Sequence, residues 1–309
     1  MASIASSDTG VATQKGRSGR QEPSRDRWIA WLWAGPAILF VAVFLVYPVI
    51  YTLWLSLFSA DSSSFVGLQN FRRIFTSSVL LEVLRNNLLW LVLGTIATVF
   101  FGLVIAVLVD RVRFEGVAKA AIFIPMSISF VGASVIWSFM YQYQPAGQEQ
   151  TGLINAVITK FGFAPQSWLT TPGLANFALI AIYVWMWTGF CMVILSAALK
   201  SVPADILEAA RVDGANEFAI FFRVTVPMIS PTIVVVATTM VINLLKIFDI
   251  IYVTTGGNFG TNVIAMSYYQ QLFTFNDSGL ASALAVILLL AVIPVLYFNI
   301  RRFRAEGVR

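Results

Sequence analysis

The stretch EAARVDGANEFAIFFRVTVPMISP, from Glu208 to Pro231, lies between two long apolar runs of the chain. Its charges are too costly for the interior of a lipid bilayer, and its residues favour a helix over an unpatterned loop. The segment therefore lies outside the lipid, while the runs on either side of it lie inside. We expect an insert of this kind to be a binding site for another molecule outside the bilayer.

The composition supports a membrane environment. Hydrophobic residues make up 58% of the chain and charged residues 11%, with a mean hydropathy of +0.81. Soluble domains carry roughly a quarter charged residues, so the sequence predicts an integral membrane protein. The chain has no histidine, which excludes a histidine proton relay and removes the commonest metal ligand, so we expect no metal site. The single cysteine, Cys191, cannot form an intramolecular disulfide.

Six apolar runs are long enough to span a bilayer, which takes about 20 residues. They predict an all-α polytopic membrane protein with six transmembrane helices. The first run lacks the short apolar region and cleavage site of a secretory signal peptide, so we interpret it as a retained helix that Pro36 and Pro48 allow to bend. The predicted spans are Ile29–Phe58, Asn86–Val109, Val117–Tyr143, Leu174–Leu199, Met228–Thr254 and Leu280–Phe303.

Lysine and arginine are unevenly divided between the two sides of these spans. Fifteen of the 20 lie on the side of the N-terminus, four lie on the other side, and Lys246 lies within a span. The positive-inside rule then places both termini and the Glu208–Pro231 insert in the cytoplasm. Residues 1–27 are basic and lack apolar periodicity, and they are predicted to form a disordered tail before a membrane domain over 28–309.

The cytoplasmic loop over 201–231 carries the signals of two short helices with a sharp bend between them. Pro203 suits the start of a helix. The pair Asp213–Gly214 predicts a tight turn, because glycine tolerates a positive φ and an aspartate side chain can bond nearby backbone amides. Residues 215–223 are predicted to form the second short helix, with Pro227 at the start of the next span. The loop is therefore expected to be a compact projection from the membrane.

This loop belongs to a longer series of sequence strings. FVGLQNF at 65–71, AIFIPMSISFVGASVIW at 121–137, ILSAALKSVPADILEAARVDGA at 194–215 and FDIIYVTTGG at 248–257 occur in that order. Together they resemble permease subunits of bacterial ATP-binding-cassette importers of the maltose and α-glucoside type, and the resemblance covers nearly the whole chain. Asn258 departs from it, because relatives commonly have proline after the glycine pair.

The resemblance implies a heterodimeric pore formed with a second homologous permease subunit, together with two ATP-binding-cassette ATPase subunits and an extracytoplasmic sugar-binding protein. The 201–231 loop is then the coupling loop that docks in a cleft of an ATPase. Its small alanines allow a close approach, and its glutamate offers a carboxylate to a basic partner. The coupling residues implied in this way are Glu208, Ala209, Ala210, Asp213, Gly214, Ala215 and Phe218.

The fifth span carries polar residues that suit a sugar. If it is one continuous helix, Asn243, Lys246, Asp249 and Tyr252 follow one another along one face. A charge at mid-bilayer costs at least about 2.5 kcal/mol, so these groups face protein or a wet path. Lys246 and Asp249 either bind substrate or form a structural ion pair. The resemblance to maltose-type permeases adds a set of positions that match those lining the sugar site, namely Asn243, Lys246, Trp187 and Phe190.

The chain contains no nucleotide-binding string GxxxxGK[ST], and no nucleophile or metal cluster stands out. It is predicted not to be an enzyme and to bind no cofactor itself, with ATP and Mg²⁺ on the partner ATPase. The favoured function is carbohydrate import by alternating access across a bacterial inner membrane, with an α-glucoside or small oligosaccharide as substrate. The alternatives are a permease for glycerol 3-phosphate or a polyol, and an ion-coupled secondary transporter with Lys246 and Asp249 as the carrier pair.

Overall fold

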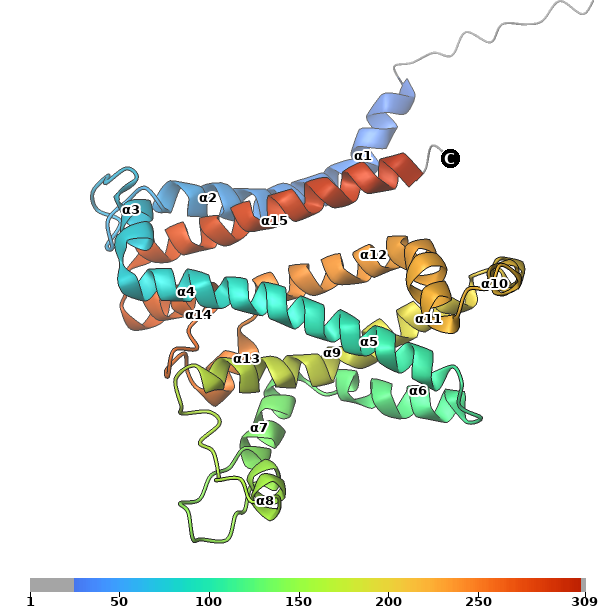
Figure 1. Cartoon of the computed structure of the whole chain (residues 1–309). Helices are drawn as coiled ribbons and strands as arrows, with labels where there is room; N and C mark the ends of the chain where they lie inside the picture. The colour runs from blue at the N-terminus through green and yellow to red at the C-terminus, as the bar shows by residue number, and fades with distance from the viewer. Residues whose placement is uncertain (1–24, 307–309) are drawn as a thin grey trace, which may run out of the picture. The chain divides into compact units, whose positions relative to one another are not determined.

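The computed structural model describes residues 25–306, whose regular structure is helical apart from one isolated β-bridge between Phe58 and Phe65 (Figure 1). The all-α prediction is confirmed for this part of the chain. The chain divides into two units, residues 1–50 and 51–309, and each is described by itself. The predicted disordered tail lies outside the described residues except at its end, where Arg25–Arg27 already belong to the first helix.

The first unit holds α1 (Arg25–Val41), a π-helical turn (Ala42–Val46) and the start of α2 (Tyr47–Leu55). Pro36 lies inside α1 without ending it. The π turn includes the carbonyl four residues before Pro48, and the wider turn accommodates a ring that has no N–H to bond that carbonyl. The chain therefore stays helical through both prolines, and the local adjustment at Pro48 is the π turn.

Five helices among the described residues are long and apolar enough to cross a membrane. Two of them begin well before the predicted spans, at Ser78 and at Glu217, because polar residues add turns to the apolar runs. The five are Trp31–Leu55; Ser78–Val109, which comprises α4 (Ser78–Leu89), a π turn (Trp90–Gly94) and α5 (Thr95–Val109); α9 (Leu174–Lys200); Glu217–Leu245, which comprises α11 (Glu217–Ile220), a π turn (Phe221–Thr225) and α12 (Val226–Leu245); and Ser278–Val295, part of α15 (Ser278–Glu306).

The predicted span Val117–Tyr143 is wrong as a single helix. The structure has two helical segments there, Glu115–Ser127 and Phe130–Met140, bent by 100°. The first comprises α6 (Glu115–Phe123) and a 3₁₀ turn that contains the buried Pro125, and the second is α7. Ser129 separates them, because its hydroxyl accepts a bond from the Gly132 N–H at 3.1 Å and so starts a new helix. The pair counts as a sixth span only if the two segments cross together.

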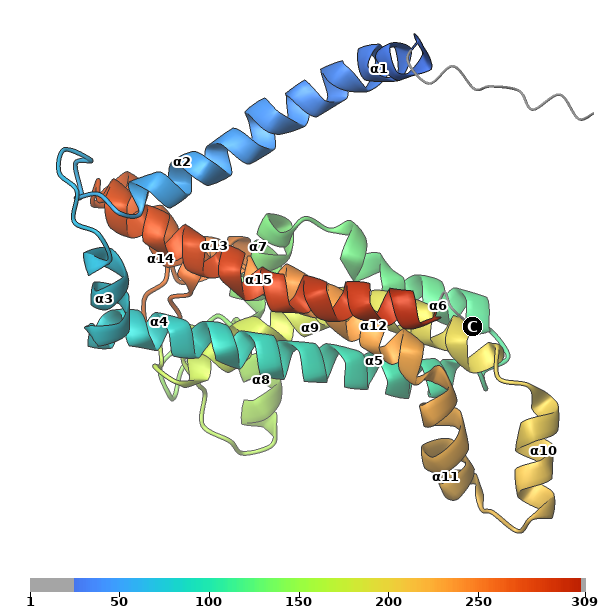
Figure 2. The ribbon, with the colours of Figure 1, turned by 90° about the horizontal axis from the view of Figure 1, so that it is seen from above.

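Shorter helices lie at the ends of the second unit and along its side. In both Figure 1 and Figure 2, α10 lies at one end of the bundle formed by α5, α9 and α12, and α3 and α14 lie at the other. We call these the α10 end and the distal end. The shorter helices are α3 (Gln69–Thr76), α8 (Leu153–Lys160), α10 (Ala204–Val212), α13 (Asp249–Thr254) and α14 (Ile264–Tyr269).

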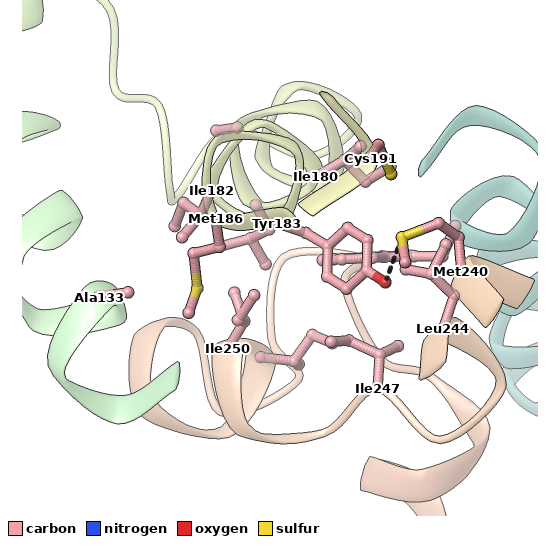
Figure 3. Close-up of a cluster of buried hydrophobic side chains, with 14 of the residues drawn as sticks. Ala133, Ile180, Ile182, Tyr183, Met186, Cys191, Met240, Leu244, Ile247 and Ile250 are labelled. Atoms are coloured by element: carbon pink, nitrogen blue, oxygen red, sulfur yellow. Dashed lines mark hydrogen bonds between the residues drawn. The ribbon is translucent and has the colours of Figure 1, made fainter. Parts of the chain in front are cut away.

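The main hydrophobic core lies where α9 meets α12 and α13. Figure 3 shows Tyr183 of α9 pointing toward Met240 of α12, and the tyrosine hydroxyl donates to the methionine sulfur at 3.7 Å. Leu244, Ile247 and Ile250 extend the same cluster past the end of α12. All of these side chains are buried, so the core links α9, the end of α12 and α13.

Small residues let α9 approach its neighbours closely. A Cβ at Gly102 of α5 would lie 2.5 Å from Cβ of Cys191, and a Cβ at Gly189 would lie 2.4 Å from the carbonyl oxygen of Ile122 in α6. Neither distance leaves room for a side chain, so glycine at both positions allows the tight helix contacts that stabilise bundles within membranes. α9 is thus the central helix against which α5 and α6 pack.

Candidate functional site

The helix α10 has the boundaries expected from local signals. It follows Pro203, whose fixed φ suits the residue before a helix, and it ends at the Asp213–Gly214 turn. Gly214 has φ of +84°, and no atom lies within 4 Å of the position where a Cβ would be. Glycine is therefore needed here for the left-handed backbone and not for space. The turn reverses the chain toward α11.

The predicted second short helix over 215–223 is wrong as a separate element. Asn216 caps a helix that begins at Glu217, where the Ala219 N–H donates to the asparagine side-chain oxygen at 2.8 Å. This helix runs without interruption to Leu245, because a π turn lies just before Pro227 and absorbs its missing N–H. The insert is therefore continuous with the membrane-spanning part of α12.

The predicted coupling residues lie on an open surface. Glu208, Ala209, Asp213, Gly214 and Phe218 are exposed, whereas Ala210 and Ala215 are half-buried. Sequence reasoning missed Ile206, Val212 and Phe222 around them, although their position next to the EAA string and Phe218 was a usable signal. The rings of Phe218 and Phe222 are in contact, with centroids 4.6 Å apart and planes tilted by 49°. The exposed apolar residues, with their exposed fractions, are Ile206 42%, Val212 87%, Phe218 73% and Phe222 53%.

α10 is held to the rest of the chain by few contacts. The side-chain nitrogen Nε of Arg211 donates to the Glu217 carboxylate at 2.8 Å, and this bond raises the pKa of Arg211. Both partners are at least half exposed, so the pair adds little to stability. Beneath it lies a cavity of about 230 Å³ lined by α10, the start of the α11 helix and the end of α5, where Asp110 and Arg111 lie. No residue of α10 is buried.

A polar cluster fixes the end of α9 from which α10 departs. Lys119 of α6 binds Asp110 at 2.7 Å and Glu115 at 2.5 Å, and the Ser196 hydroxyl of α9 donates to Asp110 at 2.6 Å. Lys200, the last residue of α9, also pairs with Glu115. These contacts join α5, α6 and α9 next to the loop. The loosely held α10 therefore projects from a firmly held base.

The predicted row of polar residues on one helical face is wrong. α12 ends at Leu245, and α13 begins at Asp249 after Phe248, whose φ is −143°. Asn243 is half-buried and donates to the Thr239 carbonyl of its own helix at 3.1 Å. Lys246 lies in the break and is exposed, as are Asp249 and Tyr252. The salt bridges of the described residues do not include a Lys246–Asp249 pair, so the structural-pair interpretation gains no support.

The predicted aromatic residues fall into two separate groups. Trp187 stacks on Tyr183 at 6.1 Å and meets Phe190 edge-on at 5.7 Å, and both predicted residues are half-buried against the core. Tyr252 stacks on Phe248 at 5.1 Å and meets Tyr269 of α14 at 5.3 Å. The first group lies on α9, where Phe130 of α7 also stacks on Trp187, and the second lies on Phe248, α13 and α14. Phe248 and Tyr269 were missed by the sequence reasoning, although aromatic density was their signal.

The chain matches, over residues 98–305, the family model described as the binding-protein-dependent transport system inner membrane component. This range is more than half of the chain. The protein belongs to this family. The family confirms the predicted permease subunit of a binding-protein-dependent transport system and its place in an inner membrane.

Several curated relatives resemble this permease along most of its length. The osmoprotective compounds uptake permease protein GgtC of Synechocystis sp. is 56% identical over 89% of this chain and 99% of its own. The alpha-glucoside transport system permease protein AglF of Rhizobium meliloti is 44% identical over 90% of this chain and 83% of its own. The trehalose/maltose transport system permease protein MalF of Thermococcus litoralis is 31% identical over 91% and 96%. The recognition of this permease family from its sequence strings is confirmed.

A solved structure supports the permease fold. The bacterial ABC transporter involved in the import of the acidic polysaccharide alginate contains a chain that matches with a TM-score of 0.73 and 24% identity. The match covers 90% of this permease and 96% of that chain. At this identity the likeness establishes the arrangement of helices, and it agrees with the predicted fold of an importer permease.

Proposed function

We propose that this permease imports an α-glucoside or a small oligosaccharide by alternating access, driven by ATP hydrolysis on separate ATPase subunits. The observation that carries the proposal is the exposed α10 surface, which joins α9 directly to the helix Glu217–Leu245. A surface with an exposed carboxylate among exposed aromatic and aliphatic side chains has the chemistry of a protein interface. The described chain leaves this surface uncovered.

The occupant of the α10 surface in this proposal is an ATPase subunit that carries ATP and Mg²⁺. Glu208 pairs with a basic group, Phe218 fills an apolar pocket, and Ala209 lets the two backbones approach closely. The remaining partners are a second homologous permease, a second ATPase and an extracytoplasmic sugar-binding protein. In this proposal the α10 end of the bundle faces the cytoplasm, and the distribution of lysine and arginine predicts that both termini do as well.

Movement of the ATPase has a mechanical route into the membrane. The helix Glu217–Leu245 has 29 residues and a length of about 40 Å at 1.5 Å per residue, so it reaches from the docking surface across the bilayer interior. It ends next to Asn243 and Lys246. Phe218 of the docking surface lies in the first turn of this helix, so displacement of the docked partner moves Asn243 at the other end without an intervening flexible link.

The substrate class follows from the relatives and from the chemistry of the exposed groups. The printed names of the relatives include alpha-glucoside and trehalose/maltose transport. In this chain Asn243, Lys246 and Asp249 offer an amide, an ammonium and a carboxylate for sugar hydroxyls, and Tyr252 with Phe248 offers a ring pair for the apolar face of a sugar. Lys246, Asp249 and Tyr252 are exposed and therefore available to a ligand or to the second permease, whereas Asn243 and Phe248 are half-buried.

The test is uptake into proteoliposomes that contain this permease, its second permease and both ATPases, supplied with the loaded binding protein outside and ATP inside. We expect ATP-dependent accumulation of maltose, trehalose, sucrose or glucosylglycerol. Accumulation of glycerol 3-phosphate instead would reassign the substrate. Uptake by this chain alone under an ion gradient would reject the ATP-driven mechanism in favour of a secondary transporter.

Lys246→Ala and Asn243→Ala test the sugar residues. Loss of a hydrogen bond from a charged group costs about 1.5–3 kcal/mol, so we expect the KM for sugar-loaded binding protein or the uptake rate to worsen by about tenfold or more in Lys246→Ala. The matched control is Lys160→Ala, which removes the same exposed charge from α8. Unchanged uptake kinetics in both Lys246→Ala and Asn243→Ala would exclude these residues from the site.

A further inference from the structure

The loop over 255–263, which joins α13 to α14 at the distal end, has an unusual backbone. Left-handed φ values occur at Gly256 (+61°), Gly257 (+82°), Phe259 (+57°) and Gly260 (+74°). Phe259 is bulky and 43% exposed, so neither its own preference nor burial of its ring favours this conformation. Such a conformation persists only where the surrounding structure holds the backbone in place.

Three buried asparagines from two membrane-spanning helices hold this loop, and we call them the asparagine clamp: Asn86, Asn87 and Asn176. Asn86 of α4 donates from Nδ2 to the carbonyls of Gly260 at 2.8 Å and Asn262 at 3.0 Å. Asn176 of α9 donates to the same Gly260 carbonyl at 2.7 Å. The Ile264 N–H donates to Oδ1 of Asn87 at 3.1 Å. The clamp thus grips the backbone of the loop and not its side chains.

The three asparagines of the clamp are buried, and Trp90 hydrogen-bonds to one of them. The side chains of Asn86, Asn87 and Asn176 are 1%, 2% and 4% exposed. The indole N–H of the fully buried Trp90 donates to Oδ1 of Asn176 at 3.2 Å, which fixes the direction of its amide. Burying amides in an apolar bundle is unfavourable unless they are hydrogen-bonded. The loop backbone supplies partners for Nδ2 of Asn86 and Asn176, and the Ile264 N–H supplies one for Oδ1 of Asn87, whereas Nδ2 of Asn87 is buried without a partner among the described residues. The hydrogen bonds of Asn86 and Asn176 therefore fix the position of the loop relative to the two spans.

The break between α12 and α13 makes this clamp mechanically important. The helix Glu217–Leu245 ends before α13 begins, so the backbone hydrogen bonds of that helix do not extend into α13. The orientation of α13 therefore depends on other contacts. On its inner side Ile250 and Ile251 are buried in the core. Its far end continues into the loop that the clamp grips. The exposed Tyr252 lies between these two attachments.

We propose that Asn86 and Asn176 are positioning residues for transport. By joining the loop to α4 and α9, they hold α13 as part of one rigid body with the spans, so that displacement of α9 at the α10 end moves Asp249 and Tyr252 by a defined amount. Without the clamp, α9 and α12 still move with the ATPase, but α13 does not follow reproducibly. This inference rests on the proposed function, and it predicts loss of coupling between ATP hydrolysis and uptake.

The first test is Asn86→Leu, which keeps the number and branching of the side-chain heavy atoms and removes the amide, with Asn86→Ala alongside it in case the larger leucine disrupts packing. We expect sugar uptake by the reconstituted importer to fall by about tenfold or more, while ATP hydrolysis stimulated by loaded binding protein stays within about twofold of wild type. The ATP consumed per sugar therefore rises. Uptake and hydrolysis falling in parallel, or neither falling, overturns the proposal.

The matched control is Asn155→Leu. Asn155 is also fully buried and also donates to two carbonyls, those of Gln142 and Gln166, each at 3.0 Å. It holds a different loop, which does not lead to α13. We expect Asn155→Leu to leave the ATP consumed per sugar unchanged even if it lowers the amount of complex. An equal rise in that ratio overturns the specific role of the clamp.

A second test does not depend on the substrate. Cys191 is the only cysteine in the sequence and is buried, so spin labels at Phe259→Cys and at Phe177→Cys, whose native side chain is 51% exposed on α9, report the distance from the loop to the span. We expect one narrow distance distribution, alike in nucleotide-free and ATP-trapped importer, and a broad one in Asn86→Leu. An equally narrow distribution in Asn86→Leu overturns the clamp, whereas failed sugar uptake by wild type concerns only the proposed function.

Discussion

The loop around α10 and the loop between α13 and α14 both depend on left-handed glycines, yet the chain treats them in opposite ways. The α10 loop turns at Gly214, where a Cβ would have no neighbour within 4 Å, and no residue of α10 is buried. The distal loop turns at Gly256, Gly257 and Gly260, and three buried asparagines bind its backbone. The α10 loop is exposed, and the distal loop is held by hydrogen bonds from α4 and α9.

This difference shows whether the geometry of each loop is set by contacts within the chain or by contacts with a partner. The α10 loop leaves Val212 and Phe218 more than 70% exposed, so contacts with another chain complete it. The distal loop takes hydrogen bonds from α4 and α9, from Gln270 and from its own residues, so contacts within the chain complete it. Similar glycine turns therefore serve a docking surface in one place and an internal support in the other.

The largest effect is expected from Glu208→Lys. Reversing the charge in the middle of the open surface places a cation against the basic partner, and like charges across an interface cost several kcal/mol, so we expect ATP-driven uptake to fall by about 100-fold. Uptake into proteoliposomes measures this. Glu149→Lys, the same change on an exposed residue of a different loop, is the control and is expected to retain uptake. Normal uptake with Glu208→Lys contradicts a docking role for the α10 loop.

Phe218→Ala is expected to act through affinity. Truncating an aromatic anchor at an interface typically costs about 2 kcal/mol, which corresponds to about 30-fold weaker binding of the ATPase. Binding of purified ATPase to the permease dimer in nanodiscs gives the Kd. Phe161→Ala removes a side chain of similar exposure, 77% against 73%, from the end of α8 and serves as the control. Equal affinities for Phe218→Ala and wild type contradict the assignment of Phe218 as an anchor.

Local signals predicted the α10 loop well because its structure is set by neighbouring residues. Pro203 starts α10 and Asp213–Gly214 ends it, as expected. The same local reasoning failed at Pro227, which was expected to start a span. The helix begins instead at Glu217 and passes through the proline, since a π turn relieves the missing hydrogen bond. The spans themselves follow from hydropathy, which depends on composition and not on tertiary contacts.

The distal region was not predictable in the same way. The sequence NLLKIFDII contains neither glycine nor proline, and nothing in it indicates a break. Around the break, Ile247 and Ile250 are buried in a core with residues of α9 and α7, which the sequence does not place nearby. The clamp likewise joins Asn86 to Gly260, 174 positions away. The predicted sugar residues could therefore be chosen from the resemblance to the family, but their arrangement in space could not be predicted from the sequence.

Gly260→Ala and Gly214→Ala compare the two loops directly. Both positions have positive φ, which costs about 1–2 kcal/mol for a residue with a Cβ. The clamp binds the Gly260 carbonyl from two sides, so this position cannot relax and is expected to show the full cost. The open Gly214 turn can relax and is expected to show less than about 1 kcal/mol. Apparent unfolding temperatures of the purified permease complex measure both, and equal shifts contradict the distinction between a held and an open loop.

The smallest effect is expected from Arg211→Ala. Its bond to Glu217 is the ion pair that spans the α10 turn, and the two side chains are 50% and 65% exposed. Water and salt screen such a pair, so its removal changes the orientation of α10 little, and we expect uptake to stay within about twofold of wild type. Uptake by both proteins is measured at low and at high salt. If the ion pair held α10 in place, high salt would lower uptake by wild type and would not change uptake by Arg211→Ala. Salt-independent uptake in both proteins means that the docked partner, and not this ion pair, sets the position of α10.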